Sequence, residues 1–329
     1  MSKRLLALLL PFLAVFAIGT AATALADDEG VVRFATLPKP GPGFPEGITA
    51  DPAGRIYVAT FDFSQPNVIY VFDRNGKVDE TISLPAGVVP LGLEFANGKL
   101  YVANFFGGTV LEYSSFTSGS LPSRTFTVCG GVPAGCGLNS LAFDAAGDLY
   151  VSDSFGGNVF RIDLPGGAVT TYLSDNLLQP GNHGFPPFGA NGLAFAGRVL
   201  YIANTADDRI LRYDPDAVAP TPKLTVFAES INGADGIAFD RKGRLWVAAN
   251  QGDEVVALNR NGRVVERVGS FDGVGNDGAA KGLLFPASIV ISRGFVYVTN
   301  LALPLTPNVG DEPEEDVSTY TVSRFRLPN

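Results

Sequence analysis

Six residues occupy the same position in six similar stretches of the sequence, and four of them are polar. In "GANGLAFAGRVLYIAN" (189–204) the residue is Asn191, and in "GADGIAFDRKGRLWVAAN" (233–250) it is Asp235. Carboxylate and amide oxygens are the hard ligands that Ca²⁺, Mg²⁺ and Mn²⁺ prefer. If the fold brings these residues together, a divalent cation is the expected counter-charge, because the set contains no Lys or Arg. We call them the leading residues: Glu46, Leu91, Asn139, Asn191, Asp235 and Ala287.

Each leading residue opens a repeated unit. The unit contains an apolar strand, a turn with glycine, a strand with an aromatic residue beside Val or Ile, and a third strand after a polar turn. Successive leading residues are 45, 48, 52, 44 and 52 residues apart. A period of this length with several strands per repeat is typical of a β-propeller. The first strand of a propeller blade lines the central channel, so the leading residues would face one axis.

The two ends of the sequence supply complementary parts of one blade. The sixth repeat has its third strand within residues 317–327 but no fourth, and a spare strand, residues 31–37, precedes the first repeat. Pairing the two would remove two open sheet edges. We therefore predict an all-β fold, a six-bladed β-propeller whose last blade is closed by an N-terminal strand, with residues 27–329 as one domain.

The N-terminal segment has the features of a secretory signal peptide. Lys3 and Arg4 precede an apolar run over residues 5–18, and a small-x-small cleavage site, residues 24–26, follows. We expect residues 1–26 to be removed and the protein to be secreted or periplasmic. No second apolar run is long enough to span a membrane.

Acidic residues outnumber basic ones. The sequence has a net charge of −9, and without Lys3 and Arg4 it has 22 basic against 33 acidic residues, or −11. Such a charge disfavours binding to nucleic acids or anionic membranes. We expect a monomer whose partners are cations and a small neutral or weakly charged substrate.

Three other residues carry candidate chemistry. Cys129 and Cys136, in "VCGGVPAGC", lack both C-x-x-C spacing and a second pair for zinc, so in an exported chain they predict a disulfide. His183 is the single histidine, eight residues before Asn191. It is a candidate substrate contact or proton shuttle at the channel mouth, or else an ordinary residue of a Pro/Gly-rich loop. A lone histidine excludes a His-rich zinc site.

The repeats resemble the SMP-30/gluconolactonase/LRE-like family of six-bladed propellers, which includes enzymes that open sugar lactones. By position within the repeat, the resemblance implies that Glu46, Asn191 and Asp235 are metal ligands and that Asn139 contacts substrate or water. Glu46, Asn139 and Asp235 each also lie five residues before an Asp. The resemblance implies one divalent cation, Ca²⁺ first, with Zn²⁺, Mn²⁺ or Mg²⁺ as alternatives.

The sequence departs from the lactonase pattern beside Asn139. Ser140 stands where the family usually has Asp, and Gly137 stands where it has Arg. We expect a metal-dependent hydrolase of a lactone or related ester, with Asp235 as ligand and general base and with altered substrate recognition. The alternative is a non-catalytic propeller that binds a ligand or protein partner. The altered neighbourhood of Asn139 favours that alternative, and residues 271–286 also resemble segments between NHL-type repeats.

Overall fold

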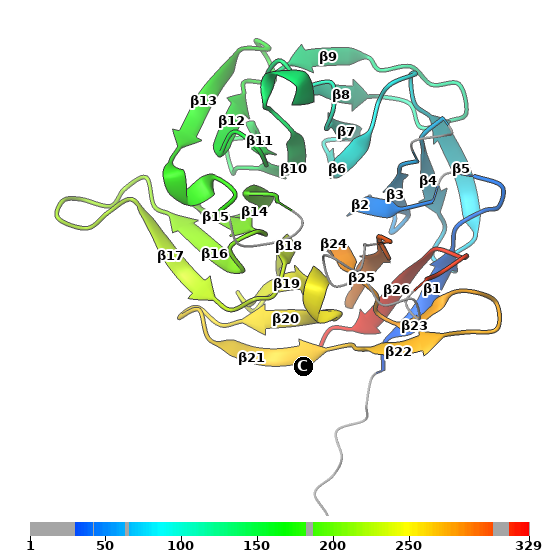
Figure 1. The fold of residues 1–329 in the computed structure, drawn as a ribbon. Coiled ribbons are helices and arrows are strands. Elements are labelled where there is room, and N and C mark those ends of the chain that lie inside the picture. Colours follow the sequence, from blue (N-terminus) through cyan, green and yellow to red (C-terminus); the bar gives the residue numbers. More distant parts are fainter. Residues whose placement is uncertain (1–29, 42, 63–65, 182–186, 305–315, 329) are drawn as a thin grey trace, which may run out of the picture.

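The computed structural model describes residues 30–41, 43–62, 66–181, 187–304 and 316–328. In these residues, six antiparallel four-stranded sheets surround a central axis (Figure 1). This confirms the all-β, six-bladed β-propeller. Residues 1–26, the predicted signal peptide, lie outside the described residues, so that assignment and the domain boundary after it stay predictions. The described residues include no helix with the length and apolar character of a membrane span.

Within each blade the strands run in order from the axis outward. Blade 1 comprises β2 (Pro45–Ala50), β3 (Ile56–Thr60), β4 (Val68–Phe72) and β5 (Val78–Ser83). Blade 2 comprises β6 (Pro90–Ala96), β7 (Lys99–Asn104), β8 (Thr109–Tyr113) and β9 (Arg124–Thr127). Blade 3 comprises β10 (Leu138–Phe143), β11 (Leu149–Asp153), β12 (Asn158–Ile162) and β13 (Val169–Ser174).

Blade 4 comprises β14 (Ala190–Ala196), β15 (Val199–Asn204), β16 (Arg209–Tyr213) and β17 (Leu224–Glu229). Blade 5 comprises β18 (Ala234–Phe239), β19 (Leu245–Ala249), β20 (Glu254–Leu258) and β21 (Val264–Val268). A hairpin of β22 (Phe271–Val274) and β23 (Ala280–Gly282) precedes blade 6.

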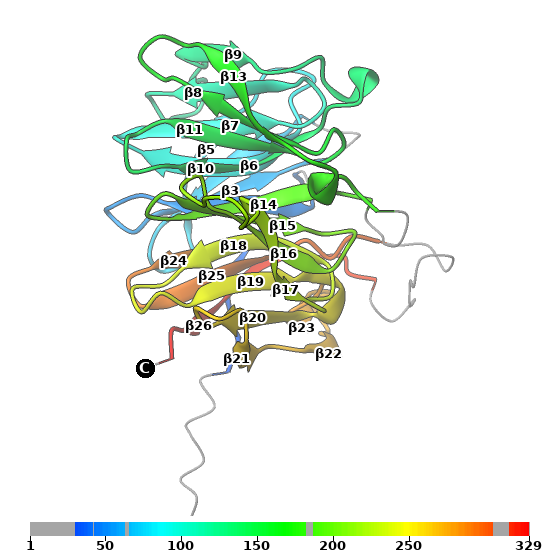
Figure 2. The same cartoon turned by 90° about the vertical axis from the view of Figure 1, so that its left-hand side faces the viewer.

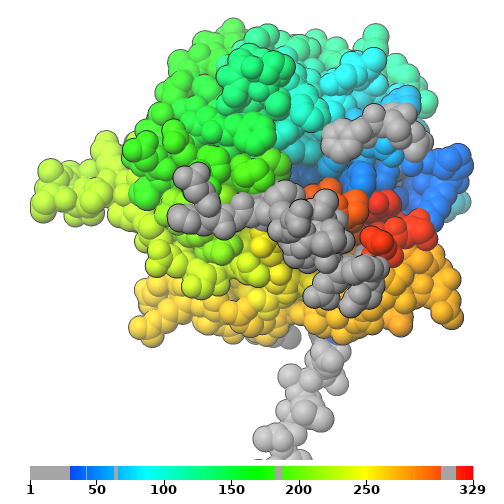
Figure 3. Space-filling model, in the orientation of Figure 1, coloured from blue at the N-terminus to red at the C-terminus, as the bar shows by residue number. Residues whose placement is uncertain are grey.

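The short helices of the described residues are η1 (Val132–Ala134), η2 (Asn176–Leu178) and η3 (Asn250–Gly252). Figure 2 shows η1 and η2 on the same face of the propeller. The turn between β16 and β17 projects from the rim (Figure 3).

Blade 6 is built from both ends of the chain. Its order is β24 (Pro286–Ser292), β25 (Phe295–Asn300), β26 (Thr321–Arg326) and β1 (Val32–Thr36). Strands β1 and β26 are antiparallel, with Val32 opposite Arg324 and Thr36 opposite Thr321. The predicted closure by an N-terminal strand is therefore confirmed. It covers the edge of β26 that would otherwise be open.

The hydrophobic core lies between adjacent blades. One cluster joins Tyr57 and Ile69 of blade 1 to Leu100 and Leu111 of blade 2, and similar clusters fill other blade interfaces. The second strands are covered on both faces, so all residues of β3 and β19 are buried and their sequences are apolar almost throughout. This packing holds the inner strands at fixed positions around the axis.

The Asp residues that follow three leading residues by five positions form turns. Asp51 accepts a hydrogen bond from the Arg55 backbone N–H (2.9 Å), and Asp240 accepts one from that of Arg244 (2.9 Å). Asp144 accepts one from the Asp148 backbone N–H (3.0 Å) in the same way. They close the turn between the first and second strands of their blades, so this spacing reflects the repeat and not the candidate site.

The predicted disulfide between Cys129 and Cys136 is present. It closes the loop that contains η1, and Cys136 is buried in the interface between blades 2 and 3. In the same loop Val132 packs against phenylalanines that follow the second strands of the blades. The loop therefore lies at the end of the channel where the inner strands begin.

Candidate functional site

The structure brings the leading residues together at one end of the channel. Each is the second residue of an inner strand, because these strands begin one position earlier in all six blades. Glycines let the strands approach closely. A Cβ at Gly47 would lie 2.3 Å from the Leu91 carbonyl oxygen, and one at Gly192 would lie 2.2 Å from that of Asp235. Neighbouring leading residues therefore stand side by side around the axis.

Glu46 and Asp235 form a buried acidic pair. Their exposed fractions are 4% and 5%. Burial raises the pKa of Glu46 well above its ordinary value, and the nearby Asp235 carboxylate raises it further. Burial also raises the pKa of Asp235, while hydrogen bonds from Asn250 and Asn191 lower it. Among the described residues, Oε2 of Glu46 and Oδ1 of Asp235 have no hydrogen-bond partner. Two buried carboxylates with free oxygens leave negative charge without a counter-charge.

Three amide and hydroxyl groups surround the acidic pair. Asn250 donates from Nδ2 to Oδ2 of Asp235 (3.2 Å). Asn191 donates from Nδ2 to the Thr205 hydroxyl (2.9 Å), which itself donates to the Ala234 carbonyl (2.8 Å). Oδ1 of Asn250 is buried and has no partner in the described part of the chain. The site therefore offers amide oxygens beside the carboxylate oxygens.

Asn250 is a site residue that the sequence analysis missed. It lies one residue beyond the position at which blades 2 and 3 have polar residues that bond local backbone, and Ala249 occupies that position in blade 5. Oδ1 of Asn104, for example, accepts from the Val89 N–H (3.1 Å), and Oδ1 of Asp153 accepts from the Gly137 N–H (3.0 Å). Asn250 turns toward Asp235 instead. The equivalent residues of blades 2 and 4 are Phe105 and Thr205, so this position varies in type and nothing in the sequence marked Asn250 as a site residue.

The two predicted substrate contacts have different outcomes. Asn139 is 2% exposed, and its Nδ2 has no hydrogen-bond partner among the described residues. It lies among the leading residues, one blade before Asn191. His183 lies outside the described residues, so its place is untested.

A cluster of phenylalanines borders the site on one side. Phe105 contacts Phe155 and Phe188 with ring centroids 5.4 and 5.6 Å apart. The apolar leading residues Leu91 and Ala287 belong to the same cluster. We call this cluster the aromatic collar, defined by Phe61, Phe105, Phe155, Phe188 and Phe285. Its members follow second strands or precede inner strands, which places them at the same end of the channel as the leading residues.

The comparisons with known proteins agree with this architecture. The family described as "SMP-30/Gluconolactonase/LRE-like region" matches residues 94–270. The chain belongs to this family. No curated protein matches the sequence.

Solved structures resemble this member of the SMP-30/gluconolactonase/LRE-like family over most of its length. A luciferin-regenerating enzyme has a TM-score of 0.65 at 16% identity, covering 90% of this chain and 95% of that one. Regucalcin from Agrobacterium tumefaciens, described as a calcium-binding protein, has a TM-score of 0.58 at 17% identity, covering 89% and 93%. Virginiamycin B lyase from Staphylococcus aureus has a TM-score of 0.57 at 13% identity, covering 91% and 98%. At these identities the likeness shows the fold.

The chemistry of the donor set fits a divalent cation. The described residues contain no group of three or more His, Cys, Asp or Glu arranged to hold a metal, so two carboxylates alone would be too few ligands. Glu46, Asp235 and Asn191 supply the hard oxygens that Ca²⁺ or Mg²⁺ accepts, and Asn250 adds one more. The unpartnered oxygens of Glu46 and Asp235 are the observation behind this fit.

Gly137 shows how this family member departs from the lactonase pattern. A Cβ at Gly137 would lie 2.7 Å from Cε2 of Phe105 and 3.0 Å from Cδ2 of Phe155. These rings occupy the space that a side chain there would need. The position that the resemblance assigns to Arg is therefore filled by the aromatic collar, and the Ser140 hydroxyl accepts a bond from the Leu193 backbone N–H (3.2 Å).

Proposed function

We propose that this protein is a metal-dependent hydrolase of a lactone or related ester. The observation that carries the proposal is the buried pair of Glu46 and Asp235, each with an unpartnered carboxylate oxygen, beside Asn191. Membership of the SMP-30/gluconolactonase/LRE-like family supports the same activity. The predicted signal peptide supports action outside the cytoplasm.

Each residue has a defined part in the proposed reaction. Glu46, Asn191 and Asp235 would hold the cation. When bound, a divalent cation supplies Lewis-acid chemistry that polarises a carbonyl and acidifies a water. Asp235 is the candidate base, because one of its oxygens is free and Asn250 fixes the other. The unpartnered Nδ2 of Asn139 would donate to a substrate oxygen.

Ca²⁺ is the first candidate for the cation. The ligand set contains only oxygen, and Ca²⁺ accepts six to eight oxygens, so the protein would leave positions for water and substrate. The structurally similar regucalcin is described as calcium-binding, which supports this choice. Zn²⁺ prefers nitrogen or sulfur ligands and fits the set less well.

The aromatic collar favours an apolar substrate over a sugar lactone. Sugar recognition needs many hydrogen-bond donors and acceptors, whereas Phe105, Phe155 and Phe188 offer ring surfaces. Gly137 supplies no charged side chain, and Ser140 already accepts from backbone. We therefore expect lactones or esters with an alkyl or aryl group to be better substrates than gluconolactone.

Cation titration of purified protein tests the proposal first. Calorimetry with Ca²⁺, Mg²⁺, Mn²⁺ and Zn²⁺ on EDTA-treated protein should show one site, and Asp235→Asn should abolish it or weaken it about a hundredfold. Leu91→Met, a change of similar volume at another leading residue, is the control and should keep the affinity. A pH-indicator assay with alkyl-substituted lactones and gluconolactone then measures hydrolysis. Activity should fall about a hundredfold or more in Asp235→Asn.

Failure of cation binding would overturn the metalloenzyme. If wild type binds none of the four ions, or if Asp235→Asn binds them equally well, the alternative propeller that binds a ligand or protein without catalysis replaces it. The loss of a side chain at position 137 is the observation that favours this alternative.

A further inference from the structure

The channel holds a cavity at the end opposite its acidic pair. The cavity has a volume of about 570 Å³ and is lined by the later residues of the six inner strands. It reaches Asn139 and Asn191 at its inner end and the turns that contain Asp51, Arg241 and Arg293 at its outer end. A volume of this size is in the range of small-molecule pockets.

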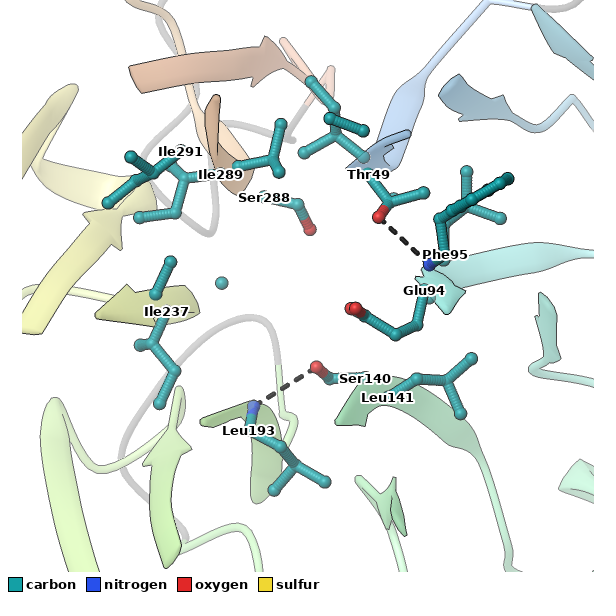
Figure 4. Close-up of a pocket in the computed structure, with 18 of the residues that line it drawn as sticks. Thr49, Glu94, Phe95, Ser140, Leu141, Leu193, Ile237, Ser288, Ile289 and Ile291 are labelled. Atoms are coloured by element: carbon teal, nitrogen blue, oxygen red, sulfur yellow. Dashed lines mark hydrogen bonds between the residues drawn. The ribbon is translucent and has the colours of Figure 1, made fainter. Parts of the chain in front are cut away.

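One carboxylate points into this cavity. Figure 4 shows the side chain of Glu94 extending from β6 toward the centre, opposite Ile237 and Ile289. Glu94 lies three residues beyond its leading residue, which is about 10 Å further along the strand. The equivalent residues of the six blades are Thr49, Glu94, Ala142, Ala194, Ala238 and Val290. Five of the six blades have a neutral residue at this position, so the fold itself does not need an acid here.

The Glu94 carboxylate has no hydrogen bond or ion pair with any residue that the structure describes. Two other buried acids, Glu112 and Asp240, are paired. Glu112 accepts from the Lys99 ammonium (2.8 Å), and Asp240 accepts from the Arg244 guanidinium (2.6 Å). Because Glu94 lacks such a partner, burial raises its pKa to about 8. An acid that the fold leaves unpaired in a cavity is a feature of binding sites.

The walls around Glu94 combine apolar side chains with the hydroxyls of Ser140 and Ser288. Leu141, Leu193, Ile237 and Ile289 line the cavity. The Thr49 hydroxyl accepts from the Phe95 backbone N–H (3.2 Å). A ligand would therefore meet one negative group among apolar side chains and hydroxyl groups.

The other charged residues that line the cavity lie on turns at its outer end. Asp51 is paired with Arg55 (2.7 Å). The Arg293 guanidinium donates to the carbonyls of Pro52 and Ala53 (3.1 and 3.0 Å). Arg241 lies on the exposed turn between β18 and β19. None of these replaces a cationic partner at Glu94, since no ion pair joins any of them to it within the described residues.

We propose that this cavity binds a small organic amine, with its ammonium group on Glu94 and its apolar body against Ile237, Ile289 and Leu193. The ammonium supplies the donor and the positive charge that Glu94 lacks. The cavity reaches Asn139 and Asn191, but the proposed ammonium position at Glu94 lies three residues beyond the leading residue of its strand, and the proposal does not depend on the proposed hydrolase activity.

Paired probes test the charge requirement. Purified protein is titrated with benzylamine and with benzyl alcohol in EDTA at pH 8.5, by calorimetry or ligand-observed NMR. The two probes differ only in the group that would meet Glu94. Benzylamine should bind wild type about tenfold tighter than benzyl alcohol, and Glu94→Gln should remove the preference. Glu94→Ala introduces the residue that blades 3, 4 and 5 have at this position, so this variant should fold. It should also lose the preference for benzylamine.

Two controls locate the binding. Ser288→Ala changes the cavity wall and keeps Glu94, so the amine preference should remain. Asp235→Asn alters the acidic pair at the other end, and it should also leave the preference unchanged. The proposal is overturned if neither probe binds, if wild type does not distinguish them, if Glu94→Gln still prefers the amine, or if Asp235→Asn alone removes the preference.

Discussion

At the scale of single residues, Glu94 should make stability depend on pH. Its pKa is about 8 in the folded protein against an ordinary 4.5, so the folded state keeps a proton that the unfolded state releases between these values. The contribution of this group to stability therefore falls as pH rises through that window. Glu94→Gln should melt about 5 °C higher than wild type at pH 9 and equally at pH 5. Melting curves at both pH values measure this, with the exposed Glu229→Gln as control. Equal differences at the two pH values would contradict the assignment.

A second residue-scale prediction concerns the acidic pair. Without a cation, Asp235→Asn relieves repulsion and burial of charge, because Glu46 and Asp235 both have raised pKa values. We expect this variant to melt a few degrees higher than wild type in EDTA at pH 8, by about 3 °C. Ca²⁺ should stabilise wild type and leave the variant unchanged. Glu46→Gln should have a similar effect, and the double variant should gain less than the sum, since both changes relieve one repulsion. Full additivity would show that the two carboxylates do not interact.

At the scale of elements, the disulfide fixes the loop that carries η1. Cys129–Cys136 closes a loop of eight residues, and loss of the bond should cost at most about 2.5 kcal/mol. The double variant Cys129→Ser, Cys136→Ser should therefore have a lower melting temperature than wild type but keep its β-sheet circular dichroism signal. Because Val132 in this loop packs against the aromatic collar, lactone hydrolysis should fall as well. Mass spectrometry of alkylated, non-reduced wild type should find no free thiol, and two labelled cysteines would contradict the bond.

At the scale of the whole molecule, the ring depends on β1. The strand pairs with β26, and Phe34 packs edge-on against Tyr297 at 4.8 Å. Deletion of residues 27–37 from the protein without its signal segment would expose the edge of β26 and this aromatic contact. We expect aggregation or a melting temperature lowered by about 10 °C or more. Size-exclusion chromatography and thermal melting measure the effect. A monomeric truncation with unchanged melting would show that blade 6 is stable with three strands.

The aromatic collar shows why site details were harder to predict than blades. Phe105, Phe155 and Phe188 come from three different loops, and no local pattern places their rings together over Gly137. The departure at Gly137 was visible in the sequence, but its meaning was not. Similarly, alternation along β6 could not show whether Glu94 faces a neighbouring blade or the channel.

The sequence by itself determined the propeller, the number of its blades, its closure by β1 and the disulfide. These features depend on patterns within a few residues of each other or on a regular repeat, which a chain displays before it folds. It also placed Glu46, Asn191 and Asp235 at equivalent positions. Only the tertiary structure decided that Asn250 turns to Asp235, that phenylalanine rings fill the space beside Gly137, and that Glu94 stands unpaired in a cavity. The physical reason is that burial, charge and free hydrogen-bonding atoms are properties of the assembled ring, since each depends on side chains from several blades at once.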